Sequence, residues 1–261
     1  MNKAMSLLIA AVAIIGLAAC NSTDNETQAN YDSNETAPNE PAEVEEVDTE
    51  EEEAEENVGS EVESYLTMQE LLLGNPDLYP VTELSGNGSG SEVFNISIEG
   101  YTLFEFENMD SDSNFIVRLE SVETGEETSS LVNEIGDYEG IAGMKLAEGD
   151  YIMQVSSDGV WSSKIHPAFT TDIDESKSWE GVGDSVIGPI VLEEGIYELT
   201  FAHEGESNFI SRTYDVLGND MGSIVNEIGN HEGNHITTAY DGEMIFIGVA
   251  ADGNWTFDLT Q

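Results

Sequence analysis

The second half of this chain repeats short motifs of the first half at a nearly constant distance. Val132-Asn-Glu-Ile-Gly136 returns letter for letter as Val225-Asn-Glu-Ile-Gly229, and Asp158-Gly-Val-Trp161 returns as Asp252-Gly-Asn-Trp255. The separation of matched motifs stays between 93 and 95 residues. Motifs that keep both order and spacing indicate a duplicated structural unit, so the chain is expected to fold into two copies of one domain.

The bounds of the duplicated unit follow from the remaining matched motifs. These are Gly86-x-Gly88 with Gly181-x-Gly183, Gly100-Tyr-Thr-Leu-Phe-Glu-Phe106 with Gly195-Ile-Tyr-Glu-Leu-Thr-Phe201, and Ser113-Asn-Phe-Ile-Val-Arg118 with Ser207-Asn-Phe-Ile-Ser-Arg212. We therefore predict one domain at residues 84–169, a polar linker at 170–177 and a second domain at 178–261.

Each copy has the sequence pattern of β-strands. Apolar and polar residues alternate in Tyr197-Glu-Leu-Thr-Phe201 and in Tyr151-Ile-Met-Gln-Val155, and Phe115, Val117 and Leu119 define one face of a third strand. A period of two is typical of half-buried strands. No apolar pattern of helix length and period occurs within either copy. The predicted fold class is therefore all-β, with two tandem, jelly-roll-like β-sandwich domains.

Two Asp-Gly pairs predict tight turns near the end of each copy. Asp158-Gly159 and Asp252-Gly253 have the residue types of a type I′ turn, in which both central residues adopt positive φ. We therefore expect a β-hairpin at each pair.

The first twenty residues have the pattern of an export signal. An apolar run follows Lys3 and is shorter than the about 20 apolar residues of a membrane span. The segment Leu17-Ala-Ala-Cys20 resembles the bacterial lipoprotein signal and holds the only cysteine of the chain. This resemblance implies that the signal peptide at residues 1–19 is removed and that Cys20 is lipidated, which would anchor the exported protein to the outer face of a bacterial membrane. A stray cysteine beside an ordinary cleavage site is the alternative.

Residues 20–63 have the composition of an acidic linker. No lysine or arginine occurs between Asn21 and Glu63, so the segment is predicted to be a disordered, self-repelling tether after the lipidated Cys20. Its carboxylates form no fixed cage, so calcium is expected to bind them loosely at most. The whole chain has a formal net charge of −48 from 54 acidic and 6 basic residues, which argues against nucleic acid as a partner.

A short helix is predicted in the connector at residues 64–83. Thr67 and Glu70 have the spacing of a capping box, and Gly74 and Pro76 follow the apolar residues that come next. We expect the helix to begin at Thr67 and to end before Gly74. Its leucines are expected to dock on the first domain, with a contact to a partner as the alternative: Leu71, Leu72 and Leu73.

The order of motifs supports a resemblance to known exported domains. The layout resembles the prokaryotic secreted domains of the pre-peptidase C-terminal type, which are jelly-roll-like sandwiches with a similar order of glycine-tyrosine strands. It resembles more closely an uncharacterised domain of bacterial and archaeal lipoproteins with the Asn-Phe, Val-Asn-Glu-Ile-Gly and Asp-Gly-x-Trp signature. That resemblance covers nearly all of residues 84–261 and implies a non-catalytic exported module.

One segment has the His-Glu-x-x-His motif of zinc peptidases. His231-Glu232-x-x-His235 would place two histidine ligands and a glutamate base together if it were helical. The first copy has Tyr138-Glu-Gly-Ile-Ala142 at the equivalent place, and the glycine and asparagine residues of the segment disfavour a helix. A zinc peptidase is therefore an alternative, beside a loose metal site formed by His231 and His235 and chance histidines on a turn.

The only two arginines, Arg118 and Arg212, occupy matching places in the two copies. In a chain so poor in basic residues, each is expected to pair with a specific carboxylate, and Glu134 and Glu227 of the repeated motif are the candidates. The pair would hold a strand to a turn. The alternative is that the arginines anchor a ligand that carries a carboxylate.

Two further matched pairs complete the candidate residues. Asn114 and Asn208 are expected to cap turns with their side-chain amides. Trp161 and Trp255 are expected to pack in the core, and a carbohydrate-binding aromatic platform is the alternative.

The predicted function is non-catalytic. We expect a lipid-anchored protein that binds or displays a ligand at the cell surface, with a wall polymer, a polysaccharide or another exported protein as its partner. Apart from the zinc and calcium alternatives above, no cofactor is expected. A ligand-capture subunit of an importer is a further alternative, disfavoured because such subunits usually have two α/β lobes and no alternation of strands and helices is seen.

Overall fold

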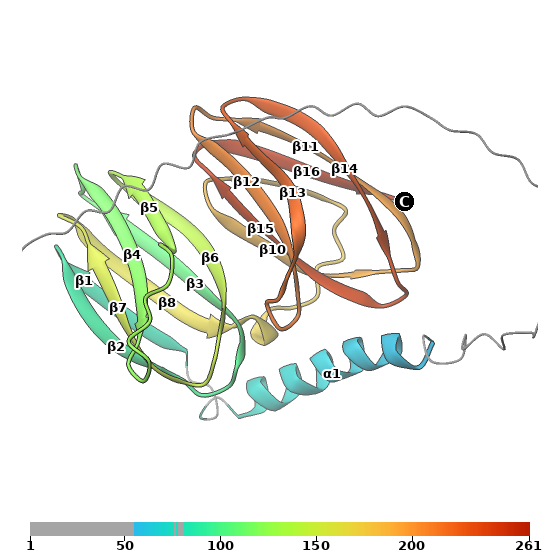
Figure 1. Cartoon of the computed structure of the whole chain (residues 1–261), viewed down its shortest axis with the longest axis horizontal. Coiled ribbons are helices and arrows are strands. Elements are labelled where there is room, and N and C mark those ends of the chain that lie inside the picture. Colours follow the sequence, from blue (N-terminus) through green and yellow to red (C-terminus); the bar gives the residue numbers. More distant parts are fainter. Residues whose placement is uncertain (1–54, 76, 78–80) are drawn as a thin grey trace, which may run out of the picture. The chain divides into compact units, whose positions relative to one another are not determined.

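Among the residues that the structure describes, the fold is all-β apart from one helix, α1 (Glu55–Gly74), and one short 3₁₀ turn, η1 (Ala168–Thr170), which confirms the predicted fold class (Figure 1). The structure is a computed structural model that describes residues 55–75, 77 and 81–261. The predicted signal peptide, Cys20 and most of the predicted tether lie outside these residues. All strands and α1 belong to one compact unit of the chain.

Eight strands form the first sandwich. Their bounds are β1 (Thr82–Asn87), β2 (Gly90–Ile96), β3 (Gly100–Met109), β4 (Asn114–Ser121), β5 (Val132–Ile135), β6 (Tyr138–Leu146), β7 (Gly149–Ser156) and β8 (Val160–Pro167). One antiparallel sheet has the order β1-β8-β3-β6 and the other has the order β2-β7-β4-β5. Only β4 and β5 are consecutive strands of the same sheet, and this order is that of a jelly roll.

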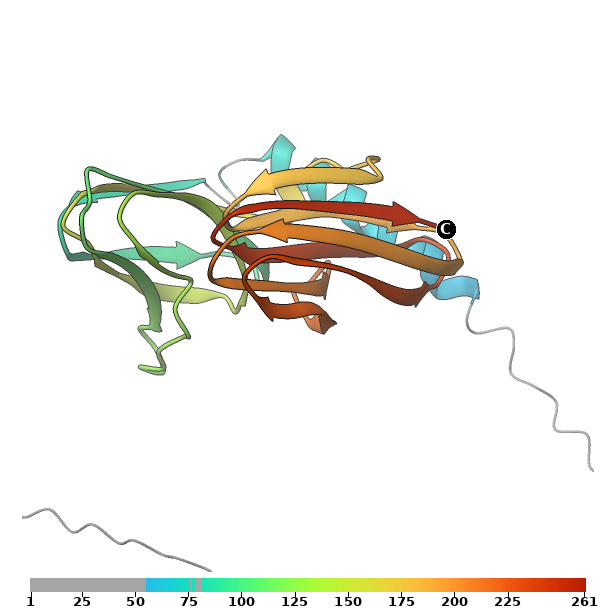
Figure 2. The ribbon, with the colours of Figure 1, turned by 90° about the horizontal axis from the view of Figure 1, so that it is seen from above.

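The second sandwich repeats the first strand for strand. Its bounds are β9 (Ser178–Val182), β10 (Ser185–Leu192), β11 (Gly195–Glu204), β12 (Asn208–Asp215), β13 (Asp220–Ile228), β14 (His231–Ala239), β15 (Glu243–Ala251) and β16 (Asn254–Thr260). The sheet orders, β14-β11-β16-β9 and β10-β15-β12-β13, match those of the first sandwich once eight is subtracted from each number. Figure 2 gives a second view of the same strands. The repeated motifs therefore reflect duplication of a complete jelly roll.

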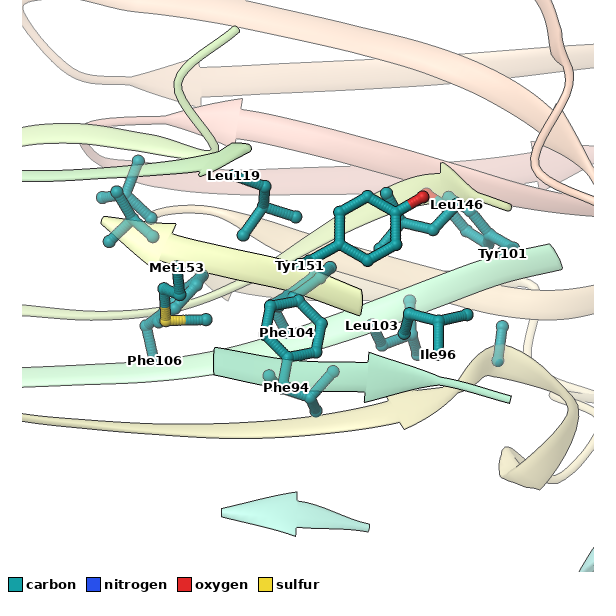
Figure 3. Close-up of a cluster of buried hydrophobic side chains, with 14 of the residues drawn as sticks. Phe94, Ile96, Tyr101, Leu103, Phe104, Phe106, Leu119, Leu146, Tyr151 and Met153 are labelled. Atoms are coloured by element: carbon teal, nitrogen blue, oxygen red, sulfur yellow. The ribbon is translucent and has the colours of Figure 1, made fainter. Parts of the chain in front are cut away.

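Alternating residues of the strands build a core inside each sandwich. Phe115, Val117 and Leu119 are fully buried, as their spacing predicts. Phe94 on β2 meets Phe104 on β3 edge to face, with ring centroids 6.1 Å apart (Figure 3). Because β2 and β3 belong to opposite sheets, this contact joins the two layers. The second sandwich has a core cluster of its own.

The predicted Asp-Gly hairpins are wrong. Asp158-Gly159 joins β7 to β8 and Asp252-Gly253 joins β15 to β16, and in each case the two strands belong to different sheets. Neither glycine has a positive φ. A Cβ atom at Gly159 would collide with the backbone carbonyl of Met109, and one at Gly253 with that of Glu204. Glycine is therefore needed for the close approach of two backbones.

Helix α1 begins earlier than predicted. It starts at Glu55, inside the segment that was predicted to be disordered, and it ends at Gly74, one residue after the predicted end at Leu73. The Thr67 hydroxyl donates a hydrogen bond of 2.7 Å to the Glu63 carbonyl one turn before it. Thr67 is therefore an interior helical residue and does not form the predicted capping box. No helix among the described residues is long and apolar enough to cross a membrane.

Tyr65 attaches α1 to the connector between the sandwiches. Its hydroxyl donates to the carbonyls of Ala168 and Thr171 at 2.9 and 2.7 Å, and its ring packs on Phe169 with centroids 5.2 Å apart. Only 1% of Tyr65 is exposed, whereas 45% of Leu71 is exposed. The predicted docking through leucines is thus wrong for Leu71, and the side chains of Leu72 and Leu73 lie outside the described part of the chain.

Candidate functional site

At one end of each sandwich the repeated motifs join into a hydrogen-bonded network. The Trp161 indole N–H donates to the Gly88 carbonyl at 3.0 Å, and the Trp255 indole N–H donates to the Gly183 carbonyl at 2.8 Å. Gly86 lies flat against the Trp161 ring, where a Cβ atom would be 2.6 Å from the indole. The Gly-x-Gly and Asp-Gly-x-Trp motifs therefore form one structural unit, in which tryptophan supplies a donor and glycine leaves room for the ring.

Both tryptophans are core residues, as predicted. The exposed fraction is 2% for Trp161 and 4% for Trp255. A stacking platform needs an exposed ring face, so the alternative of an aromatic carbohydrate platform is wrong for these two residues.

The aspartates of the same motif cap neighbouring turns. Asp158 accepts a hydrogen bond from the Ser111 hydroxyl at 2.7 Å. Asp252 accepts from the backbone N–H groups of Glu206 and Ser207 at 2.9 and 2.8 Å. Each aspartate thus fixes the turn that precedes β4 or β12.

The glycine of Val-Asn-Glu-Ile-Gly completes the network. Gly136 and Gly229 have φ values of 88° and 79°, a conformation that favours glycine. The Asn108 amide donates to the Gly136 carbonyl, and Nδ1 of His203 donates to the Gly229 carbonyl, both at 2.9 Å. The identical motifs are therefore explained largely by the architecture of the sandwich end.

The predicted arginine-glutamate pairs do not form among the described residues. Arg118 lies on the outer face of β4, whereas Glu134 is opposite the buried Phe115 and so lies on the other face of the sheet. Arg118 is exposed and has no ion pair there. Arg212 instead donates from Nε to Asp220 at 2.8 Å, across an exposed hairpin.

The other members of the predicted polar network are exposed. Glu227 lies opposite Phe209, as Glu134 lies opposite Phe115, and so does not share a face with Arg212. The side-chain amides of Asn114 and Asn208 make no hydrogen bond within the described ranges, so the predicted caps are wrong. These asparagines simply begin β4 and β12.

The zinc-peptidase segment lies on strand β14. His231 and His235 are four residues apart on a strand, which places their backbones about 13 Å from one another. Zinc ligands must all lie within about 2.1 Å of the ion, which requires the two rings to be adjacent. The His231 ring instead packs on Phe201 with centroids 6.0 Å apart. Within residues 55–75, 77 and 81–261, no three His, Cys, Asp or Glu side chains are placed to hold a metal ion.

The two sandwiches share an apolar contact centred on Tyr101. Its ring stacks on Tyr214 of β12 and packs on Phe246 of β15, with centroids 5.3 and 5.2 Å apart. Only 1% of Tyr101 and none of Phe246 is exposed. A contact that is dehydrated and apolar restricts the relative motion of the domains that share it.

Asp184 forms a second, polar contact between the sandwiches. One carboxylate oxygen accepts from the Tyr138 hydroxyl at 2.8 Å, and the other accepts from the Ala251 N–H at 3.0 Å. The Asp184 carbonyl also accepts from the Ile141 N–H on edge strand β6 at 3.0 Å. Burial raises the pKa of Asp184, against the hydrogen bonds from Tyr138 and Ala251, which act to lower it.

A cleft of about 1180 Å³ lies beside this contact and is lined by both sandwiches. Strands β1, β3, β6 and β8 form one wall, and the β9–β10 and β15–β16 turns contribute to the other. Lys164 is the only lysine or arginine in the lining. The carboxylates of the lining are Glu83, Glu105, Glu107, Glu134, Asp137, Glu139, Asp184 and Asp252.

The lining of the cleft carries far more carboxylates than basic side chains, so its surface is anionic. Lys164 is already paired with Glu105 at 2.8 Å. Burial raises the pKa of Glu134, and the charges of Asp184 and Asp252 raise it further. Glu134, a predicted site residue, is thus brought together with carboxylates of the second sandwich and away from Arg118.

The residues of this contact were not identified from the sequence, although a signal was present. Leu103 of β3 corresponds to Glu198 of β11, and Tyr214 of β12 corresponds to Glu120 of β4. Outward positions that are apolar in one copy and polar in the other indicate a face buried in only one copy. Positions at which the two copies differ, read together with the positions at which they are identical, therefore indicate the contact face.

Comparison with known proteins gives no family. No family model matches the sequence, and no curated protein matches it. A chain of the Sulfolobus turreted icosahedral virus is similar with 13% identity and a TM-score of 0.27, over 69% of this chain and 58% of the viral one. The PBSX exported protein XepA is similar with 7% identity and a TM-score of 0.24, over 70% of this chain and 86% of XepA. At these scores neither likeness carries an argument about function.

Proposed function

We propose that this chain is a non-catalytic, lipid-anchored protein that binds a ligand at the outer face of a bacterial membrane. The Leu17-Ala-Ala-Cys20 segment and the acidic residues after it support the anchor and the tether. The ligand is a wall polymer, a polysaccharide or another exported protein.

The cleft between the two sandwiches is the observation that carries this proposal. Ligand sites occur preferentially at domain interfaces, and most are concave spaces of about 300 to 1,000 Å³. The present cleft, at about 1180 Å³, is slightly larger than this range. Tyr101, Asp184 and Tyr65 link the elements around it, which supports a preformed binding site.

The two alternative functions lack such support. A peptidase would need His231 and His235 on one helical turn, and both lie on β14. An importer subunit would usually need two α/β lobes, and the two lobes here are β-sandwiches.

Blocking the cleft tests the binding proposal. Ser162 lines the cleft from β8, and Thr256 is its equivalent on β16, outside the lining. The full chain and its Ser162→Trp and Thr256→Trp variants would each be used to capture ligand from the native cell envelope. We expect Ser162→Trp to abolish capture of whatever the unaltered chain retains, and Thr256→Trp to leave it intact. Equal capture by all three proteins would contradict the assignment of the cleft.

Lipidation is tested at Cys20. We expect the unaltered protein to be found in the membrane fraction and Cys20→Ala to lose labelling by a fatty-acid probe. A Cys20→Ala protein that keeps the label would contradict the proposed anchor.

A further inference from the structure

We propose that the cleft selects a positively charged polypeptide segment, so that the partner is an exported protein with lysine or arginine residues in an extended stretch. This inference rests on the proposed function, and it chooses one of the three ligand classes named there.

The charge of the cleft is the first argument. Eight carboxylates line it, and Lys164, the single lysine or arginine of the lining, is already paired with Glu105. Of the seven other carboxylates, Asp252 has the His203 ring at 3.4 Å, and the remaining six have no lysine, arginine or histidine partner among the described residues. A surface of this kind repels sugar acids and other anionic polymers and attracts cations.

The shape of the cleft is the second argument. With a volume of about 1180 Å³, it exceeds the usual range for small-molecule sites, so it has room for several residues of a peptide. Carboxylates of both sandwiches face this one space: Glu134 comes from β5 and Asp252 from the β15–β16 turn. A cationic side chain between them would relieve the repulsion that the carboxylates now exert on one another, which is the reason that the pKa of Glu134 is raised beyond the effect of burial.

The scarcity of exposed aromatic rings disfavours a polysaccharide. Sugar rings are commonly bound by stacking on aromatic faces, and the aromatic residues of the lining are Phe106 and Tyr138. They are only 2% and 8% exposed, so neither offers a free face. Trp161 and Trp255 are buried as well.

Matched variants in the two copies provide the test. Glu134 and Glu139 line the cleft, whereas their equivalents, Glu227 and Glu232, are exposed residues of the second sandwich outside it. Glu134→Gln/Glu139→Gln and Glu227→Gln/Glu232→Gln therefore remove the same charge from the same repeat positions. None of these four side chains makes a hydrogen bond or ion pair within the described residues, so both double variants are expected to fold.

The measurement is binding of a fluorescein-labelled tetralysine peptide to the full chain, by fluorescence anisotropy in about 150 mM salt. At this salt, interactions between exposed charges more than about 8 Å apart are largely screened. We expect the cleft variant to weaken binding about tenfold through the loss of two ion pairs, one of them at the half-buried Glu134, and the matched variant to change it less than twofold. A tetraserine peptide should not bind.

The outcomes separate this inference from the proposed function. Equal weakening by both double variants would mean diffuse attraction to the acidic surface and would overturn the inference. Unchanged binding in both would overturn it as well. If the envelope ligand captured in the Ser162→Trp experiment were a polysaccharide, the proposed function would stand and the choice of a basic polypeptide would fall.

Discussion

Single residues explain why short motifs recur in two domains that otherwise differ. In both copies a tryptophan, a glycine against its ring and an aspartate at a neighbouring turn form one contact set. Each member requires the others, because the indole fits only where a glycine leaves room. The motifs are therefore repeated mainly because the same residues pack together at one end of each sandwich.

The glycine beside each tryptophan gives a first prediction. Gly181→Ala would place a Cβ atom 2.2 Å from a carbon of the Trp255 ring, and overpacking of this kind costs about 1 to 3 kcal/mol. We expect the free energy of unfolding, measured in urea, to fall by that amount. Gly90→Ala is the matched control, because nothing lies within 4 Å of its added Cβ atom. Equal losses in the two variants would contradict the contact.

The arginines give a second prediction, of a smaller change in the free energy of unfolding. Arg212 and Asp220 form an exposed pair, with 40% and 46% of their side chains accessible, and such pairs contribute at most about 1 kcal/mol. We expect Arg212→Met to lower the free energy of unfolding by less than 1 kcal/mol, and Arg118→Met to lower it by less still. A loss of several kcal/mol in either variant would show a partner that the structure does not contain.

At the level of elements, the sequence predicted strands better than it predicted their connections. The period-two pattern located β4, β7 and β11 because one face of each is buried in a core. The Asp-Gly pairs were wrongly predicted to form hairpins, because turns within a sheet and connections from one sheet to the other use the same residue types. The start of α1 was missed because Tyr65, which holds the helix by contacts to residues 168–171, is far from them in sequence.

The helix gives a third prediction. Tyr65→Phe removes the hydroxyl proton that the Ala168 and Thr171 carbonyls share, and it should lower stability by about 1 to 2 kcal/mol. Hydrogen exchange in α1 and in η1 should become faster in this variant, whereas Leu66→Ala, at a residue that is 44% exposed, should leave both unchanged. Exchange in α1 that does not respond to Tyr65→Phe would mean that the helix is held by other contacts.

At the level of the whole molecule, the differences between the copies carry as much information as the identities. Tyr138 donates a hydrogen bond to Asp184 of the second sandwich, and its equivalent in the second copy is His231, whose ring packs on Phe201. The histidine of the zinc-peptidase pattern thus stands where the first copy needs a tyrosine for domain contact. The candidate cleft could not be predicted from the sequence, because it depends on how two outward faces fit together.

The buried carboxylates give a fourth prediction, on pH. The pKa values of Asp184 and Glu134 are raised in the folded protein, so the fold binds their protons more tightly than the unfolded chain does. Their stabilising effect is complete below the usual carboxyl value of about 4 and is lost as pH rises through the raised values. We expect the urea midpoint to fall between pH 4 and pH 7. Asp184→Asn should make that fall smaller, and the exposed control Glu227→Gln should alter it less; an identical slope in Asp184→Asn would contradict the assignment.

The central claim is that the two sandwiches hold one fixed arrangement around the cleft, through Tyr101 and Asp184. The most direct measurement is the distance distribution between spin labels at Glu92→Cys on β2 and Thr256→Cys on β16, in full chains that also carry Cys20→Ala. Both label positions are exposed and lie in different sandwiches. We expect a single narrow distribution that broadens when Tyr101→Asp is added. A distribution that is already broad without Tyr101→Asp would show independent domains and would contradict the account.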